Sequence, residues 1–326
     1  MLNYLIRRIA FGVLTLILIS FIVYGLIRNM PGTPLTTAMS MVDPSREISA
    51  EDVKRLERIF GLDRPWHEAY FVWIGNVVRG DFGRSLTRPN AVVELIRQRV
   101  GPTLLLTLSS LSIAWLLSVP MGILATARSG RVDERLVSTL LYMLYALPSF
   151  VAALFLQILL AVKLGWLPLL GMTAANYDRL SPIGQAWDIF QHAFMPVLCY
   201  TYGSLAFDMR FTKANMEEVV RQDYIRTARA KGVGPVGVFC KHAFRNALVP
   251  LVTMIGLTLP VLLSGSILIE RIFSWPGMGS LYFESLLERD YPTIMGLTLM
   301  FSVLTLIGQL LADVLYAAVD PRVSYS

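Results

Sequence analysis

Six long runs without Asp, Glu, Lys or Arg set the hydrophobic pattern of the chain. They are 19, 27, 27, 19, 24 and 22 residues long and occupy positions 9–27, 101–127, 136–162, 189–207, 246–269 and 291–312. A helix needs about 20 residues to cross the hydrocarbon core of a bilayer, so each run can span it. Buried helices of soluble proteins, the alternative, are usually shorter. The pattern predicts an all-α integral membrane protein with six transmembrane helices.

Composition agrees with a bilayer environment. The 326 residues are 55% hydrophobic and only 16% charged, whereas globular domains carry roughly 25% charged residues. This composition excludes a disordered chain, a disulfide scaffold and a nucleic-acid binder with a basic face. Cys199 falls within the fourth run and Cys240 in a basic loop, so neither a disulfide nor a metal pair is expected.

The distribution of basic residues predicts the orientation. Fourteen Lys/Arg occur in 1–8, 128–135, 208–245 and 313–326, and four occur in the opposite short loops. The positive-inside rule therefore places both termini in the cytoplasm, together with the whole net charge of +6. Arg7 and Arg8 precede the first run as in a signal peptide, but no small-x-small cleavage site follows closely, so an uncleaved anchor is expected.

Three parts of the chain follow from this topology. Residues 1–27 are predicted to be an N-terminal anchor helix, residues 28–100 an extracytoplasmic helical segment, and residues 101–326 a five-helix core. Within the second part, Ser49 to Asp52 are typical of a capping box. Trp66, Tyr70, Trp73 and Val77 have helical spacing, which fits a helix at the membrane interface or one that packs over the helix bundle.

The basic loop 208–245 has a helix–turn–helix pattern. Apolar residues recur every four positions at Met216, Val220, Tyr224 and Ala228, and then at Val236, Phe239, Cys240, Ala243, Phe244 and Ala247. Between the two sets, Gly232 is expected to adopt a left-handed conformation, and Pro235 suits the first turn of the second helix. Such a loop could lie on anionic lipid or provide a docking site for a cytosolic subunit.

Catalytic motifs are missing from the sequence. It has no Gly-Lys dipeptide, so it lacks a phosphate-binding loop of the G-x-x-x-x-G-K-[ST] type and is not expected to hydrolyse ATP. An intramembrane protease is disfavoured because His192 is the only histidine in an apolar run and no G-x-S-x-G motif occurs. A secondary transporter would show internal repeats and charges within the spans, which are not found.

Motifs along nearly the whole chain resemble the B-type permease subunits of bacterial ABC importers for dipeptides, oligopeptides and nickel. The strongest, 223–232 (DYIRTARAKG) followed by 242–250 (HAFRNALVP), is similar to the coupling loop of these importers. Arg226, Thr227 and Ala228 stand where importers in general have Glu-Ala-Ala, a change typical of the peptide and nickel branch. The other motifs lie at 4–8, 30–34, 61–65, 79–85, 270–279 and 289–292.

This resemblance implies a fold, a location and a set of partners. The fold would be the type I ABC importer permease fold, with 101–326 as the permease core, in the bacterial cytoplasmic (inner) membrane. The partners would be a second, C-type permease, two cytosolic ATPase subunits that hold ATP and magnesium, and an extracytoplasmic solute-binding protein. The chain itself would need no cofactor, metal or nucleic acid. The expected solute is a dipeptide or oligopeptide, with nickel or another small solute as the alternative, and a membrane scaffold or receptor as the alternative outside transport.

The resemblance also implies two sites. The first, where the coupling helix contacts an ATPase, comprises Asp223, Arg226, Thr227, Ala228, Gly232 and Pro235. The second is expected to form part of the outer gate or of the seat for the binding protein, and it comprises Glu270, Trp275, Pro276, Gly277 and Gly279. A purely structural turn before the last span is the alternative for the second site.

Overall fold

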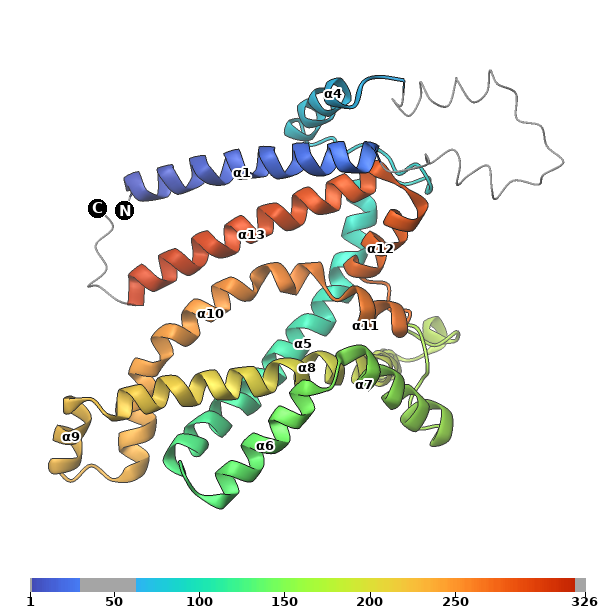
Figure 1. Ribbon diagram of the computed structural model, residues 1–326. Coiled ribbons are helices and arrows are strands. Elements are labelled where there is room, and N and C mark those ends of the chain that lie inside the picture. Colours follow the sequence, from blue (N-terminus) through green and yellow to red (C-terminus); the bar gives the residue numbers. More distant parts are fainter. Residues whose placement is uncertain (1, 30–62, 320–326) are drawn as a thin grey trace. The chain divides into compact units, whose positions relative to one another are not determined.

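The computed structural model describes residues 2–29 and 63–319 (Figure 1). These residues are helical or irregular and contain no strand beyond an isolated bridge between Arg84 and Ala91. The chain forms two compact units, which are described separately below. One contains Met1–Gly101 and Gly277–Ile307, and the other contains Pro102–Pro276 and Gly308–Ser324. Residues 277–307, which belong to the predicted permease core, therefore cluster with the N-terminal part of the chain.

The N-terminal unit includes the packed pair of helices α1 (Leu2–Arg28) and α4 (Trp66–Val78). Its other helices are the start of α5 (Val92–Ala127), α12 (Met278–Glu288) and the first part of α13 (Tyr291–Val319). Tyr70 of α4 is buried against α1, where its hydroxyl lies 2.9 Å from Ser20 Oγ and its ring meets Phe21 edge-on at 5.1 Å. The helix predicted around Trp66 and Val77 is thus present, and it packs on α1. The predicted capping box at 49–52 lies outside the described residues.

The second unit contains most of the remaining helices. They are the rest of α5, then α6 (Val132–Ala146), α7 (Ser149–Leu156), α8 (Pro182–Val220), α9 (Asp223–Ala230), α10 (Phe244–Ser264) and α11 (Ile267–Ile272), with π-helical segments at Gln157–Lys163 and Gly237–Ala243 and a 3-10 turn at Tyr177–Arg179. Ser181 caps α8 by accepting a hydrogen bond from the Gly184 N–H, and Pro182 occupies the first turn. Met195 and Cys199 of α8, Ala153 of α7, and Ile269 and Phe273 form one buried core.

Three described helices are long and apolar enough to cross a membrane, at Ile6–Arg28, Val92–Ala127 and Tyr291–Val314. Two of the other predicted spans, 189–207 and 246–269, fall on α8 and on α10 with α11. The six-span count and the cytoplasmic termini remain predictions.

Two of the apolar runs do not form single straight helices. The run 136–162 was expected to be one span, but the chain bends by 91° between α6 and the helical stretch that starts at Ser149. Leu147 is extended there because the following Pro148 disfavours the helical conformation. The run 246–269 is interrupted at Gly265, which has a φ of +65°.

Candidate functional site

The segment predicted to couple to an ATPase forms a short exposed helix, α9. Asp223 and Arg226 on its outer face are paired at 3.5 Å, with 94% and 78% of their side chains exposed. An exposed pair of this kind contributes little stability. Ile225 and Ala228 are buried on the opposite face. The helix therefore rests on a hydrophobic support and presents charged side chains outward.

A compact hydrophobic cluster supports α9. It consists of the buried residues Met216, Ile225, Val238, Ala243 and Ala247, with Phe239 and Phe244 partly buried at its edge. These residues come from α8, α9, the π-helical segment and α10, so the cluster joins all four elements of the coupling region.

The prediction of which residues face this cluster was partly wrong. α8 runs unbroken through Asp208 to Val220, and α9 begins only at Asp223, so residues 216–228 are two helices and not one. The break at Arg221 and Gln222 turns Tyr224 outward, where it is 44% exposed, and buries its neighbour Ile225. In the second set, Val236 is 76% exposed and Val238 is buried in its place, because Gly237–Ala243 is π-helical and does not keep the α-helical period.

The turn after α9 has the predicted conformation. Gly232 has a φ of +79°, and its N–H donates to the Arg229 carbonyl at 3.0 Å while the Val233 N–H donates to the Ala228 carbonyl at 3.2 Å. These bonds close the C-terminal end of α9, and glycine is the residue that adopts such a φ without strain. Pro235 is the first residue of the next helical segment, as expected.

Ion pairs join the end of α8 to the α5–α6 turn. Lys213 Nζ lies 2.8 Å from Glu134 Oε1 and 3.6 Å from Glu217 Oε1, and Ser129 Oγ donates to Glu217 Oε1 at 3.0 Å. The hydrogen bond from Lys213 holds the pKa of Glu134 below its ordinary value, and the same bond raises the pKa of Lys213. These ion pairs thus fix the C-terminal end of α8, the helix that leads to α9, against the α5–α6 turn.

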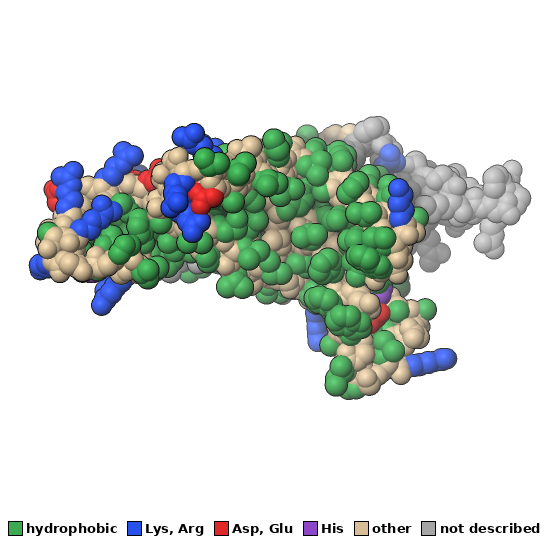
Figure 2. Space-filling view, turned by 90° about the horizontal axis from the view of Figure 1, so that it is seen from below, with side chains coloured by type: hydrophobic (Ala, Val, Ile, Leu, Met, Phe, Trp, Pro, Cys, Tyr) green, Lys and Arg blue, Asp and Glu red, His purple; other side chains and the backbone are tan. Residues whose placement is uncertain are grey.

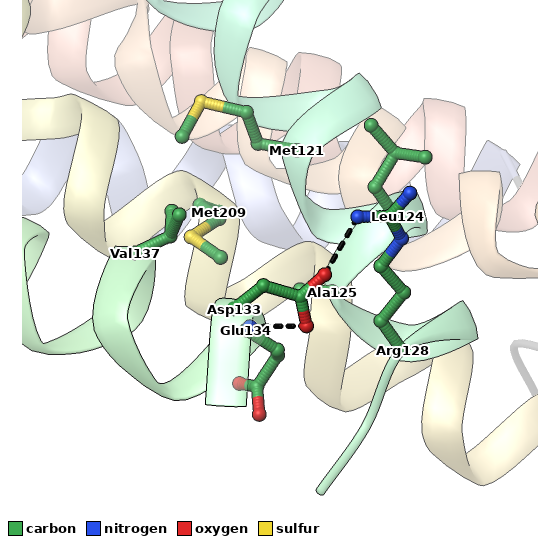
Figure 3. A pocket seen from close by; sticks show the side chains of 8 residues that line it. All are labelled: Met121, Leu124, Ala125, Arg128, Asp133, Glu134, Val137 and Met209. Carbon is green, nitrogen blue, oxygen red and sulfur yellow. Dashed lines mark hydrogen bonds and ion pairs between the residues drawn. The ribbon is translucent and has the colours of Figure 1, made fainter. Parts of the chain in front are cut away.

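A small pocket lies beside these ion pairs (Figure 3). Its volume is about 220 Å³, and its wall is formed by apolar residues of α5, α6 and α8, namely Met121, Leu124, Ala125, Val137 and Met209. Arg128 and Asp133 lie at its rim, joined at 2.6 Å. The pocket belongs to the packing of the α5–α6 turn against α8.

Basic side chains gather around α9. Figure 2 shows Lys and Arg collected at the end of the molecule that carries α9 in Figure 1. The exposed ones from Asp223 to Arg245 are Arg226, Arg229, Lys231, Lys241 and Arg245. Together with Asp223, they form what we call the coupling surface, which has the charged and exposed character expected of a protein docking site.

The second predicted site, which we call the outer motif, is buried and not exposed. Glu270 and Trp275 are both 0% exposed. Thr103 Oγ1 donates to Glu270 Oε1 at 3.0 Å, and the Trp275 indole N–H donates to the Pro102 carbonyl at 3.0 Å. The Trp275 ring packs against Leu106 and Ala193. Neither side chain presents surface to a soluble protein in this conformation.

The chain around Glu270 is shaped to bury this carboxylate. Gly265 has a φ of +65°, and a Cβ at this position would lie 2.2 Å from Glu270 Oε1, so the close approach requires glycine. The Trp275 N–H donates to the Glu270 carbonyl at 2.7 Å, which closes the turn. Of the other predicted residues, Pro276 is partly buried, and Gly277 and Gly279 are buried at the start of α12 in the N-terminal unit. Most residues of the motif are thus buried inside the protein. Its role as a gate or as a seat for the binding protein remains a prediction.

Sequence reasoning missed one polar cluster in the N-terminal unit. Asp290 is 0% exposed and accepts hydrogen bonds from Ser85 Oγ (2.5 Å), the Leu86 N–H (3.0 Å) and Thr293 Oγ1 (2.7 Å). Arg88 lies beside it and pairs with Glu284 at 3.1 Å. The motifs 79–85 and 289–292 were noted separately, but no local signal joins residues about 200 positions apart.

Comparison with known proteins assigns the chain to a family. The profile of the binding-protein-dependent transport system inner membrane component matches residues 118–325, and that of the N-terminal region of the same membrane components matches residues 1–107. The chain belongs to this family of permease components of ABC transporters, which are multi-pass proteins of the inner membrane.

Individual relatives match over their full length. The chain is 39% identical to the oligopeptide transport system permease protein AppB of Bacillus subtilis, over 99% of each chain. It is 37% identical to the glutathione transport system permease protein GsiC of Escherichia coli, over 100% of each. A chain of the MetNI methionine ABC transporter superposes with a TM-score of 0.54 at 20% identity, covering 70% of this chain and 97% of that one. This likeness confirms the predicted importer permease fold.

Proposed function

We propose that this chain is a permease subunit of an ATP-driven, binding-protein-dependent importer of dipeptides or oligopeptides. The observation that carries the proposal is the similarity to AppB, at 39% identity over 99% of each chain. GsiC supports the same class of solute, because glutathione is itself a tripeptide. The chain would form half of the translocation pathway.

The energy source would lie in partner subunits. Two cytosolic ATPases would bind ATP and magnesium, a C-type permease would supply the other half of the pathway, and an extracytoplasmic binding protein would deliver the peptide. The coupling surface supports the ATPase contact, because α9 presents Asp223, Arg226 and Thr227 outward on a firm hydrophobic base. The exposed basic residues around α9 would pair with acidic groups of the ATPase.

Movement of the ATPases would reach the pathway through α8. This helix is 39 residues long, or about 58 Å at 1.5 Å per residue, and its C-terminal end shares a hydrophobic cluster with α9. A displacement of α9 would therefore shift α8 as a rigid element. In thermodynamic terms, ATP binding would favour one of two packings of the bundle, and the contact of α9 with the ATPase would carry the difference in free energy.

The outer motif would act as a hinge or gate element by its packing and not by direct contact. Glu270 is buried and hydrogen-bonded within the second unit, directly after the predicted span 246–269, and buried ionisable groups in membrane proteins commonly mark solute pathways. A change in the packing of Trp275 would alter this part of the pathway. Seating of the binding protein would then fall to other residues of the predicted outer face.

Uptake of labelled peptides tests the proposal directly. Cells that lack only this chain should lose binding-protein-dependent uptake of a labelled dipeptide or tripeptide, and a plasmid copy should restore it. The same cells should take up labelled nickel at an unchanged rate. Loss of nickel uptake with unchanged peptide uptake would overturn the peptide assignment and favour the nickel alternative.

A further inference from the structure

A cavity in the N-terminal unit is not used by the transport proposal. Its volume is about 880 Å³, and it lies between the end of α1, one face of α4, the loop at 83–86 and the start of α13. All of its lining residues belong to this one unit. The size falls within the range of roughly 300–1,000 Å³ that is usual for ligand sites.

Arginines dominate the polar lining. Arg28, Arg64 and Arg84 line the cavity, and Asp63 is the one acid among its described lining residues. The Arg28 guanidinium donates to the Arg64 carbonyl at 3.1 Å, and that of Arg84 donates to the Pro89 carbonyl at 3.1 Å. Within the described part of the chain, the side chains of Arg64 and Arg84 have no carboxylate partner. Such a wall favours an anion, and guanidinium groups match phosphate oxygens well.

The rest of the lining is aromatic and apolar. Tyr24 and Trp73 stand 6.0 Å apart between ring centroids and line the cavity together with Tyr291. Ala69, Val72 and Met295 complete the apolar part. Tyrosine and tryptophan gather where a membrane protein crosses the headgroup layer, because their rings have an apolar body and a polar end.

The exposed surfaces beside the cavity place it at the edge of the hydrocarbon. On α4, the side chains of Phe71 and Val78 are largely exposed, as are those of Ile22 and Leu26 of α1 just before Arg28. Apolar side chains on two adjacent helices would be unfavourable in water and suit lipid acyl chains. On α1, Arg28 lies two residues beyond the exposed Leu26.

We propose that this cavity binds the headgroup of an anionic phospholipid. The lipid phosphate lies against Arg64 and Arg84, and the upper part of an acyl chain follows Val72 and Met295. The positive charges of Arg64 and Arg84, which have no carboxylate partner among the described residues, select an anionic lipid over a zwitterionic one. The proposal needs the chain to lie in a membrane but does not depend on which solute is transported.

Lipid titration of the purified transporter tests this proposal. The complete complex, with its partner subunits, is freed of lipid in mild detergent and titrated with phosphatidylglycerol while binding is followed by native mass spectrometry. Each arginine should contribute roughly a fivefold gain in affinity, so the R64Q/R84Q variant should bind phosphatidylglycerol about 25-fold more weakly. The matched control R97Q/R179Q removes two exposed arginines outside the cavity and should bind as the unchanged protein does.

Two further probes identify the source of the phosphate. Phosphatidylcholine has the same phosphate but no net charge, so R64Q/R84Q should weaken its binding by a smaller factor than the binding of phosphatidylglycerol. Inorganic phosphate should not displace bound phosphatidylglycerol, because it lacks the acyl chains.

Three results would overturn the proposal. The first is unchanged phosphatidylglycerol affinity in R64Q/R84Q, and the second is full displacement by inorganic phosphate, which would define a simple anion site. The third, also measured in R64Q/R84Q, is normal lipid binding together with lost stimulation of ATPase activity by the binding protein. That result would make the cavity a protein contact.

Discussion

The coupling surface and the outer motif are both family motifs of the sequence, yet their physical character is opposite. Asp223 and Arg226 of α9 are largely exposed and form an ion pair with each other. Glu270 and Trp275 are fully buried and hydrogen-bonded to Thr103 and Pro102, in the part of α5 that belongs to the second unit. Two motifs that resemble the same family can thus have opposite structural settings, one an exposed charged surface and the other a buried, hydrogen-bonded interior. The two kinds respond differently to substitution, as the following predictions show.

Replacing Trp275 with alanine should have the largest effect on stability. The substitution removes a fully buried ring that packs against Leu106 and Ala193 and also donates a hydrogen bond to Pro102. We expect a loss of about 3–5 kcal/mol, measured as a fall in the melting temperature of the purified complex. Trp275→Phe keeps most of the packing and should cost less than half as much. A Trp275→Ala complex with an unchanged melting temperature would contradict the burial of this residue.

Replacing Gly232 with valine should have an intermediate effect on stability and a large one on coupling. A β-branched residue at a φ of +79° should cost on the order of 1–2 kcal/mol and displace the turn after α9. Solute uptake should fall several-fold while the amount of complex in the membrane changes little. Gly234 lies two residues away, has a negative φ, and a Cβ there would meet no atom within 4 Å. Gly234→Ala is therefore the matched control and should transport normally.

The ion pair between Lys213 of α8 and Glu134 should make a small, pH-dependent contribution to stability. Lys213→Met should cost about 1 kcal/mol or less, because the pair is partly exposed. The pKa of Glu134 is lowered, so its share of the stability is full above its ordinary pKa of about 4.5 and is lost as the pH falls below that value. The pKa of Lys213 is raised, so its share persists up to its ordinary value of 10.5 and is lost at still higher pH.

Thermal melting of the unchanged protein and of Lys213→Met at pH 7 and pH 4 measures this contribution. The difference between the two proteins should shrink at pH 4. A difference that stays the same at both pH values would show that the charge of Glu134 contributes nothing.

Replacing Arg226 with alanine should have the smallest effect on stability. The side chain is 78% exposed and, among the described residues, its one ion pair is with the more exposed Asp223, so the change should stay within about 0.5 kcal/mol. ATP hydrolysis stimulated by the loaded binding protein should nevertheless fall. An unchanged stimulated rate would remove Arg226 from the coupling surface while leaving α9 itself in place.

Much of this structure followed from local pattern. The charge-free runs located α1, α5 and α13, and the glycine and proline at 232 and 235 located the end of α9 and the start of the next helical segment. The aromatic spacing around Tyr70 located α4. Each of these depends on helical periodicity or on the backbone preference of one residue type, which a single sequence contains.

Other features depend on information that the local pattern lacks. The break at Arg221 and Gln222 carries no glycine or proline, so the apolar period was continued through it, and the π-helical segment shifted the next apolar face by part of a turn. The hydrogen bonds of Asp290 to Ser85 and Leu86 join positions more than 200 residues apart. The motif alone could not show whether Trp275 is buried or exposed, because tryptophan is common in both settings.

Photocrosslinking from α9 tests the central claim most directly. A photoreactive residue is placed at Thr227, which is exposed on α9, and at Arg179, which is exposed in a loop predicted to lie on the opposite side of the membrane. The account predicts that the probe at 227 crosslinks to an ATPase subunit in intact membranes, that the yield changes when ATP is added, and that the probe at 179 gives no such product. Crosslinking of position 227 only to lipid, with normal peptide uptake by the same variant, would contradict the assignment of α9 as the ATPase contact.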